Sequence, residues 1–264
     1  MTAGTIIVTG SDGAIGSAAC RMLRERGYTV IGTSRRVESG NLNHLDQSSP
    51  QSIHTFARRL ADNGIRIDGL LHNAGTMRRT YATTPEGLEL TIATNYYGVY
   101  LLTRELLPLL NEGANIVGTV SLTCNIAHID NNFFNTGAGA FSQLGTYAAS
   151  KLAVMLLFDE LLRRHGDRYR INVTDPGVVD SRMLHMDRWY DPLADTLFRP
   201  FCKKPEGGAT PAVNAVTAET GGRLFRGYRS RPFPKRWLNP GLSQWLWQES
   251  EKHFLSQNRD NDIT

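Results

Sequence analysis

The chain has 264 residues, of which 41% are hydrophobic and 20% are charged, so it can bury a full core, and its composition excludes a disordered or fibrous protein. The net charge of +4 comes from lysines and arginines spread along the sequence, which excludes a basic block of the kind that binds nucleic acid. Its 3 cysteines show no metal-ligand or disulfide spacing, and no apolar run approaches the roughly eighteen residues that span a bilayer. We therefore expect a cytoplasmic globular protein with no metal site and no membrane span.

Short runs of β-branched residues alternate with helical patterns over much of the chain. The later runs are continuously apolar, which is typical of strands covered by helices on both sides. Such βαβ units predict an α/β fold over residues 1–264, namely a single-domain Rossmann fold with a doubly wound parallel sheet and helices on both faces. The pattern predicts strands at 4–10, 28–34, 67–75, 114–121 and 170–177, and helices at 20–26, 52–60, 94–110 and 147–164.

The periodicity weakens after Gly177, where aromatic residues and prolines become frequent, and helical patterns return at 207–219 and 242–254. Open α/β sheets bind substrates outside the carboxyl ends of their strands, and late insertions often cover that crevice. We therefore expect residues 180–204 to form a substrate lid. An ordinary surface insertion held by aromatic packing is the alternative.

A glycine-rich segment, TGSDGAIG at residues 9–16, joins the first predicted strand to the first helix. Glycine lets the backbone turn sharply and approach a pyrophosphate, and a helix N-terminus offers it free N–H groups. The segment therefore predicts a dinucleotide site, although a glycine turn without a ligand is the alternative. The residues expected to contact the cofactor here are Gly10, Ser11, Asp12, Ala14, Ile15 and Gly16.

The end of the second predicted strand reads Ser34-Arg35-Arg36. Chains that prefer NAD usually carry an acidic residue at this place, where it binds the ribose 2′-hydroxyl. A carboxylate would repel the 2′-phosphate of NADP, whereas guanidinium groups hold phosphate through charge-assisted hydrogen bonds. We therefore expect these three residues to select NADP(H) over NAD(H). The alternative is that both arginines are solvated loop charges.

Tyr147 and Lys151 are four residues apart at the start of a strongly helical stretch, so both lie on one helix face. A phenol with an ordinary pKa near about 10 is a poor acid or base at neutral pH unless a nearby cation favours the phenolate. Lys151 is placed to provide that cation. Read alone, such a pair is more often a packed tyrosine and a solvated lysine, and its value comes from the other motifs.

Taken together, these motifs resemble those of the short-chain dehydrogenase/reductase family, in the family's order and over nearly the whole chain. The matching positions are the glycine turn at 9–16, Asp46 at the place that follows the family's third strand, Asn73-Ala74-Gly75, Asn95, Ser121, the YAASK motif at 147–151 and the turn Pro176-Gly177.

The resemblance implies a role for each matching residue. Tyr147 is the expected proton donor or acceptor, and Lys151 lowers its pKa while binding the nicotinamide ribose. Ser121 is expected to hydrogen-bond the substrate oxygen, and Asn95 to hold a water that connects Lys151 to solvent. Further cofactor contacts are implied for Asp46 at the adenine, for Asn73, Ala74, Gly75, Pro176 and Gly177, and for Val179 and Ser181 at the carboxamide and phosphate ends.

Within the family, the retinol-dehydrogenase-like branch is the most similar. Residues 84–103 resemble its helix leading to the catalytic asparagine, and 224–227 and 244–251 resemble its C-terminal region. The gap from Ser121 to Tyr147 is also longer than is usual in the family. This branch implies a small, apolar carbonyl or alcohol substrate.

Four positions depart from the family pattern: Ala14, His72, Asp175, and Leu122, which follows Ser121 where a second polar residue is frequent. Ala14 replaces a glycine of the turn, and His72 replaces an asparagine before Asn73. Thr119 and Thr123 flank Ser121 at intervals of two residues, so strand alternation would point all three hydroxyls the same way, and either threonine is an alternative to Ser121. Asp175 before Pro176 has no explanation from the sequence.

The sequence therefore predicts an NADP-dependent oxidoreductase that moves a hydride between the cofactor and a carbonyl or alcohol carbon. A non-catalytic dinucleotide-binding scaffold or sensor, and an epimerase or dehydratase on the same fold, are the alternatives. The helix after Asn95 and the helix that carries Lys151 are where relatives commonly pair, so we expect a homo-oligomer, either a homodimer or a homotetramer.

Overall fold

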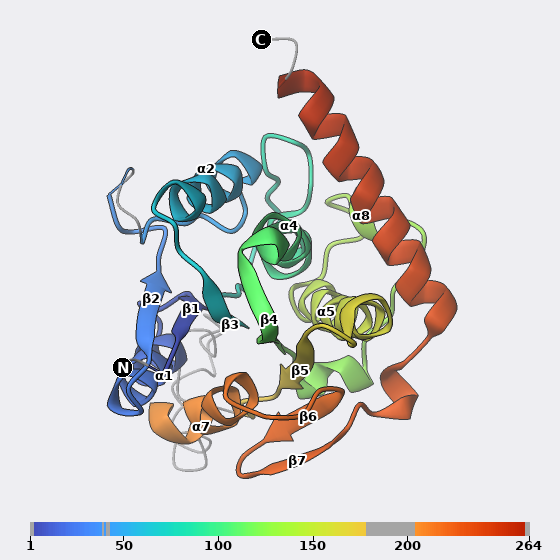
Figure 1. The fold of residues 1–264 in the computed structure, drawn as a ribbon. Helices are drawn as coiled ribbons and strands as arrows, with labels where there is room; N and C mark the ends of the chain where they lie inside the picture. Colours follow the sequence, from blue (N-terminus) through green and yellow to red (C-terminus); the bar gives the residue numbers. More distant parts are fainter. Residues whose placement is uncertain (1–2, 39, 41–42, 178–203, 262–264) are drawn as a thin grey trace.

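The structure is a computed structural model, and it describes residues 3–38, 40, 43–177 and 204–261 (Figure 1). It confirms the predicted α/β class, because the strands form one seven-stranded sheet in the order β2-β1-β3-β4-β5-β6-β7 with helices on both faces. In chain order the strands are β1 (Thr5–Thr9), β2 (Thr29–Thr33), β3 (Ile67–His72), β4 (Leu110–Thr119), β5 (Arg170–Thr174), β6 (Arg223–Arg226) and β7 (Arg229–Pro232).

Helices α2, α4 and α5 cover one face of the sheet, and α1 and α7 cover the other (Figure 1). Each face buries its own apolar cluster against the helices. Among the described residues, no helix is both long and apolar enough to cross a bilayer. The helices are α1 (Ala14–Glu25), α2 (Pro50–Asp62), α3 (Leu90–Ile92), α4 (Gly98–Leu106), α5 (Gln143–His165), α7 (Pro205–Val216) and α8 (Pro240–Asn261).

Strand β1 lies between β2 and β3 and pairs with both in parallel, so the chain reverses its direction of progress across the sheet at this point. In open α/β sheets, ligands bind at such a switch point, outside the carboxyl ends of the strands. The turn after β1 and the residues after β3 therefore meet at this edge. This places Gly10 beside Asn73 and Ala74.

Strands β6 and β7 were not predicted. Strand β6 pairs in parallel with β5, whereas β7 pairs with β6 in antiparallel orientation, so the sheet is parallel except at this edge. Both strands have only four residues, and arginines occupy several positions because much of the hairpin faces solvent. Neither an apolar run nor a clear alternation marks them in the sequence.

The strand expected to precede Asp46 is reduced to an isolated bridge between Ser34 and His44. Among the described residues, two backbone hydrogen bonds support it, from Ser34 N to Asn43 O at 3.0 Å and from Leu45 N to Ser34 O at 3.2 Å. A single bridge does not make a strand, so Asp46 belongs to the segment that leads into α2.

Helix α8 packs along α5 and across α4, outside the sheet (Figure 1). The hydroxyl of Tyr96 donates to Leu246 O at 3.1 Å, and the rings of Tyr100 and Trp247 meet edge to face with centroids 5.3 Å apart. The helix faces that we expected to pair between subunits are therefore covered in part by α8 of the same chain. The expected lid at 180–204 lies outside the described residues except for Lys204, which is the N-cap of α7.

Candidate active site

The glycine turn after β1 has the geometry that only glycine permits at two positions. Gly10 has a φ of +68°, and a Cβ there would lie 2.9 Å from Ala74 Cα. A Cβ at Gly16 would lie 2.2 Å from the carbonyl oxygen of Gly10. The Asn73 amide holds the turn from the other side, because its Nδ2 donates to Thr9 O at 2.9 Å. The sequence therefore fixes a narrow turn with its backbone exposed to the pocket.

Helix α1 starts at Ala14, directly after this turn. Its N-cap, Gly13, has no side chain to cap the first N–H groups, which stay free for an anion. Ala14 has entered the helix, where alanine is favoured, so the replacement of the family glycine is tolerated.

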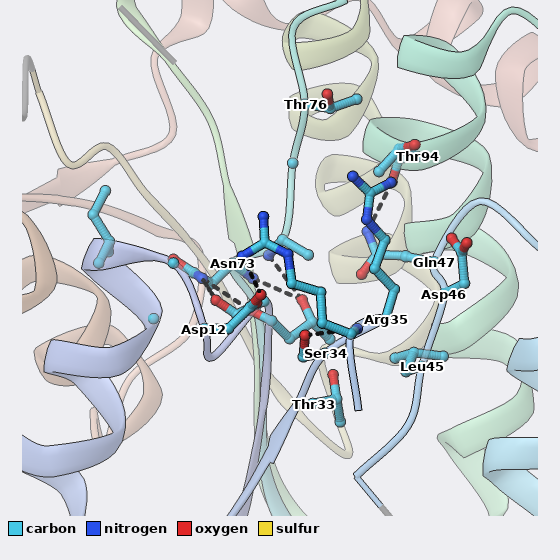
Figure 2. A pocket seen from close by; sticks show the side chains of 18 of the residues that line it. Asp12, Thr33, Ser34, Arg35, Leu45, Asp46, Gln47, Asn73, Thr76 and Thr94 are labelled. Carbon is cyan, nitrogen blue, oxygen red and sulfur yellow. Dashed lines mark hydrogen bonds and ion pairs between the residues drawn. The ribbon is translucent and has the colours of Figure 1, made fainter. Parts of the chain in front are cut away.

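A pocket of about 730 Å³ opens over this turn, at the switch point of the sheet. Figure 2 shows Asp12 and Asn73 on one side of it and Leu45 and Asp46 on the other, with Ser34 and Arg35 between them. A volume of this order holds a drug-sized ligand, and the free N–H groups suit phosphate, so the residues present fit a dinucleotide. The walls are formed by residues 9–10, 12–17, 33–36, 45–47, 73–77 and 94.

The predicted 2′-phosphate site lies on this pocket, since Ser34, Arg35 and Arg36 all line it. Ser34 Oγ accepts a hydrogen bond from Arg36 N at 3.1 Å, which shapes the loop. The Arg36 guanidinium lies 3.1 Å from Asp12 Oδ2, so it offsets the charge of a carboxylate placed beside the phosphate turn. Two guanidinium groups thus lie at the end of β2, and that of Arg36 is paired with Asp12.

Asp46 lies on the opposite wall and shapes the entry to α2. Its Oδ1 accepts from Ser48 N at 2.9 Å and from Ser48 Oγ at 2.7 Å. The sequence reasoning missed its neighbour Gln47, which donates from Nε2 to Thr94 O at 2.8 Å and ties this wall to the helix before α4. Other pocket residues that we did not predict are Thr9, Gly13, Ser17, Thr33, Leu45, Thr76, Met77 and Thr94. Most of them are chain neighbours of predicted residues, which is the signal that would have found them.

Tyr147 and Lys151 do lie side by side near the N-terminus of α5, with Lys151 Nζ 5.7 Å from the centre of the Tyr147 ring. Lys151 is only 4% exposed, and its ammonium donates to Thr119 O at the end of β4 at 3.0 Å. The Tyr147 hydroxyl shares a side-chain hydrogen bond with Ser121. The predicted phenol, ammonium and hydroxyl are therefore brought together at the carboxyl end of β4.

Ser121 differs from its two threonine neighbours in this geometry. Strand β4 ends at Thr119, and Ser121 caps a short 3-10 helix, Leu122–Asn125, that contains Thr123. The expected strand alternation therefore stops before Thr123, because the backbone has left the extended conformation. Thr119 and Thr123 both have buried hydroxyls without a hydrogen-bond partner among the described residues.

Asn95 lies in a π-helical turn, Ala93–Tyr97, and is 1% exposed. Its Oδ1 accepts from Thr76 N at 2.7 Å, and its Nδ2 donates to Thr76 O at 2.8 Å and to Ser150 Oγ at 3.0 Å. The side-chain amide therefore binds protein groups at both ends and links the segment after β3 to α5. π-Helical turns of this kind occur often at functional sites.

Gly75 lies between the pocket and the candidate catalytic cluster of Tyr147, Lys151 and Ser121. A Cβ at Gly75 would lie 3.3 Å both from Asn95 Oδ1 and from Lys151 Nζ. Any side chain here would press on the two groups. Gly75, which lines the pocket, therefore lets the pocket wall lie directly beside Lys151.

The pKa values of Tyr147 and Lys151 do not agree with the prediction that Lys151 lowers the pKa of Tyr147. Burial raises the pKa of Tyr147 to about 12, although its hydrogen bond to Ser121 lowers it. Burial lowers the pKa of Lys151 to about 8, against the opposing effects of Cys124 and Asp175. Lys151 is therefore neutral at the pH where the phenol titrates, so the protein's own groups do not give the predicted lowering of the Tyr147 pKa by Lys151.

Two remaining positions explain departures from the family. His72 is 1% exposed, shares a 2.9 Å hydrogen bond with Thr103 Oγ1, and has its pKa lowered by burial to about 3, so it is a neutral core residue. Gly177 has a φ of +74°, and its N–H donates to Asp175 Oδ1 at 2.9 Å, which closes the turn through Pro176. Val179 and Ser181 lie outside the described residues.

Comparison with known proteins relates this chain to dehydrogenases. A sequence model described as short chain dehydrogenase matches residues 4–189. The chain is 30% identical to human (Homo sapiens) retinol dehydrogenase 13 over 276 aligned positions, which cover 94% of this chain and 83% of the relative. It is 31% identical to mouse (Mus musculus) polyprenol dehydrogenase, with 83% of this chain and 74% of that protein covered.

Solved structures show the same fold. A protein from Mycobacterium paratuberculosis matches with a TM-score of 0.75 and 27% identity, covering 95% of this chain and 93% of its own. A short-chain dehydrogenase from Burkholderia cenocepacia, solved in complex with NADP, matches with a TM-score of 0.64 and 21% identity, covering 86% of this chain and 97% of its own.

Proposed function

Because this chain belongs to the short-chain dehydrogenase family, most similar to its retinol-dehydrogenase-like branch, we propose that it is an NADP-dependent oxidoreductase acting on a small, apolar alcohol or carbonyl compound. The observation that carries the proposal is the meeting of Tyr147, Lys151 and Ser121 at the carboxyl end of β4. The cluster adjoins a dinucleotide-sized pocket through Gly75.

The nicotinamide of NADPH, when bound, supplies the hydride for reduction of a carbonyl carbon. Tyr147 donates its phenolic proton to the carbonyl oxygen as negative charge develops there. Ser121 Oγ accepts from Thr123 N at 3.3 Å, and its hydroxyl, which bonds Tyr147 in the free protein, donates to the same substrate oxygen. Lys151, held by Thr119 O, keeps positive charge near the phenolate that remains.

Two exposed leucines next to the catalytic groups support an apolar substrate. Leu122 follows Ser121 and is 37% exposed, and Leu144 is 44% exposed, one helical turn before Tyr147. Exposed apolar side chains at a reacting centre favour a substrate that covers them. The two curated relatives carry retinol and polyprenol in their names, and both compounds are apolar alcohols.

NADPH consumption across a series of aldehydes and ketones graded by apolar size tests the proposal, with NADH run beside NADPH. We expect consumption that increases with apolar size. Binding of NADPH without consumption by any carbonyl compound would instead support the scaffold or sensor. Turnover at constant NADPH absorbance would support the epimerase or dehydratase.

The preference for NADPH depends on Arg35 and Arg36. Replacing both by alanine removes two charge-assisted contacts to the 2′-phosphate, so we expect the KM for NADPH to rise about 10- to 100-fold while the KM for NADH changes little. Steady-state kinetics with both cofactors measure this. Arg24→Ala with Arg58→Ala is the matched control, since both arginines are exposed and neither lines the pocket. Equal losses for the two cofactors would contradict the assignment.

Cytoplasmic localisation and a homo-oligomer are further proposals from the sequence. Because α8 covers part of α4 and α5, we propose that subunits pair through surfaces that α8 leaves free. Sedimentation velocity of the purified chain measures the oligomeric state, and fractionation of the source cells tests the localisation.

A further inference from the structure

Asp175, the residue without an explanation from the sequence, is a buried carboxylate at the edge of the catalytic cluster. It follows β5 directly and is 2% exposed. Its N–H donates to Phe225 O of β6 at 2.9 Å, so the backbone at Asp175 is held by β6. Thr174, one residue earlier, pairs with Thr119, whose carbonyl oxygen accepts from Lys151. Asp175 is thus one residue beyond the strand position that lies beside the Lys151 anchor.

The two carboxylate oxygens of Asp175 have different surroundings. Oδ1 accepts from Gly177 N at 2.9 Å and shapes the turn. Oδ2 makes no hydrogen bond among the described residues and lies 3.5 Å from Nε of Arg226, which is 40% exposed. A buried carboxylate normally takes several hydrogen bonds, so this oxygen keeps much of its charge available to other groups nearby.

Charged and titratable groups face Asp175 and its surroundings from three elements. Helix α5 contributes Tyr147 and Lys151, the short helix after Ser121 contributes Cys124, and β6 contributes Arg226. Burial raises the pKa of Cys124 to about 11, so its thiol carries no charge at neutral pH. Among the described residues, Asp175 is therefore the anion that acts on Lys151.

We propose that Asp175 is a positioning residue for the proposed oxidoreductase reaction: its buried carboxylate holds the ammonium of Lys151 in the charged form, and Arg226 limits this effect by pairing with the same oxygen. This gives the two oxygens separate tasks. Oδ1 builds the turn at Pro176-Gly177, and Oδ2 supplies charge.

Lys151 titrates close to physiological pH, so a nearby charge changes how much of it is protonated. Burial has already brought its pKa down to about 8, so a small further decrease would leave the amine neutral in much of the population. Lys151 is charged below its pKa. Loss of the Asp175 charge therefore lowers the pH above which Lys151 becomes neutral, and loss of the Arg226 charge raises that pH.

Two variants separate the tasks and shift the pKa in opposite directions. Asp175→Asn keeps an oxygen to accept from Gly177 N but removes the charge, and we expect the pKa of Lys151 to fall by about one unit. Arg226→Gln frees the Asp175 carboxylate, and we expect that pKa to rise. Arg229→Gln is the matched control, because Arg229 is the exposed cross-strand neighbour of Arg226 and its loss leaves the Asp175–Arg226 pair in place.

The pKa of Lys151 is read in the protein alone, by trace acetylation from about pH 6 to about pH 11 with peptide mass spectrometry. Lys235, which is exposed, is the internal reference. The alkaline limb of the kcat profile, recorded separately, is expected to move with the same sign in each variant. A merely structural role for Asp175 would lower the melting temperature without moving either midpoint.

An unchanged Lys151 midpoint in Asp175→Asn overturns the proposal. If Asp175→Asn does not fold, Arg226→Gln decides, and a midpoint that stays or falls in that variant overturns it equally. Because acetylation needs neither cofactor nor substrate, its result stands even if no carbonyl compound is turned over. Failure of the proposed function is thus distinguishable from failure of this inference.

Discussion

Tyr147→Phe is expected to lower kcat/KM for carbonyl reduction by about 10³- to 10⁴-fold while leaving the affinity for NADPH unchanged. The phenolic hydroxyl is the group that shares a hydrogen bond with Ser121 at the catalytic cluster, and the substitution removes that oxygen alone. The ring remains beside the Lys151 ammonium, so the packing at the N-terminus of α5 is preserved. Because we propose that the lost hydroxyl gives its proton to the substrate oxygen, the loss should appear in the chemical step.

Single-turnover kinetics measure the hydride-transfer rate, and fluorescence titration measures NADPH binding. Tyr81→Phe is the matched control, because it removes the same hydroxyl from a tyrosine that packs against Phe141 outside the cluster. We expect near-normal turnover in the control. Normal turnover in Tyr147→Phe would remove the phenol from the mechanism, and a parallel loss of NADPH binding would make its role structural.

The sheet was predictable from sequence where strands were apolar, and less so at its edges. β1, β3, β4 and β5 are buried between two helical layers, so their composition alone marks them. β6 and β7 owe their pairing to neighbours rather than to their own pattern, and their arginines reflect exposure. The strand expected before Asp46 does not form, because only the isolated bridge between Ser34 and His44 pairs that segment with the sheet.

The site shows a similar division between what spacing decides and what packing decides. Helical geometry guarantees that Tyr147 and Lys151 share a face, and the structure has them in contact. Their pKa values depend on burial by elements far away in the sequence, and here burial makes Lys151 titrate before Tyr147. When bound, an oxidised nicotinamide brings a positive charge that lowers the pKa of both groups. The order of titration was therefore not available from the motif.

Lys151→Met is expected to reduce kcat/KM by about 10²- to 10⁴-fold. It should also remove the part of the pH dependence of the unfolding free energy that comes from Lys151. The ammonium is 4% exposed and donates to Thr119 O, so methionine fills the space but cannot supply the charge. NADPH affinity should fall as well, unlike in Tyr147→Phe, because Lys151 lies beside Gly75, which lines the pocket.

The pH dependence follows from the lowered pKa of Lys151, about 8 in the fold against an ordinary value of 10.5. Between these values the unfolded chain binds the proton and the folded chain does not, so stability rises with pH. The contribution of Lys151 is complete above the unfolded pKa and is lost as pH falls through the folded one. The shift corresponds to about 3 kcal/mol of unfolding free energy.

Urea unfolding at several pH values, compared between the unaltered protein and Lys151→Met, isolates this contribution because the other titrating groups are common to both. We expect the unfolding free energy of the unaltered protein to rise by about 3 kcal/mol relative to that of Lys151→Met from neutral to alkaline pH. Lys235→Met, at an exposed lysine, should show no such growth. A constant difference would mean that Lys151 is not desolvated in the fold. Lys151 would then keep its charge without help from Asp175. The protonation of Lys151, the charge of Asp175 and the pH limit of turnover would be independent of one another.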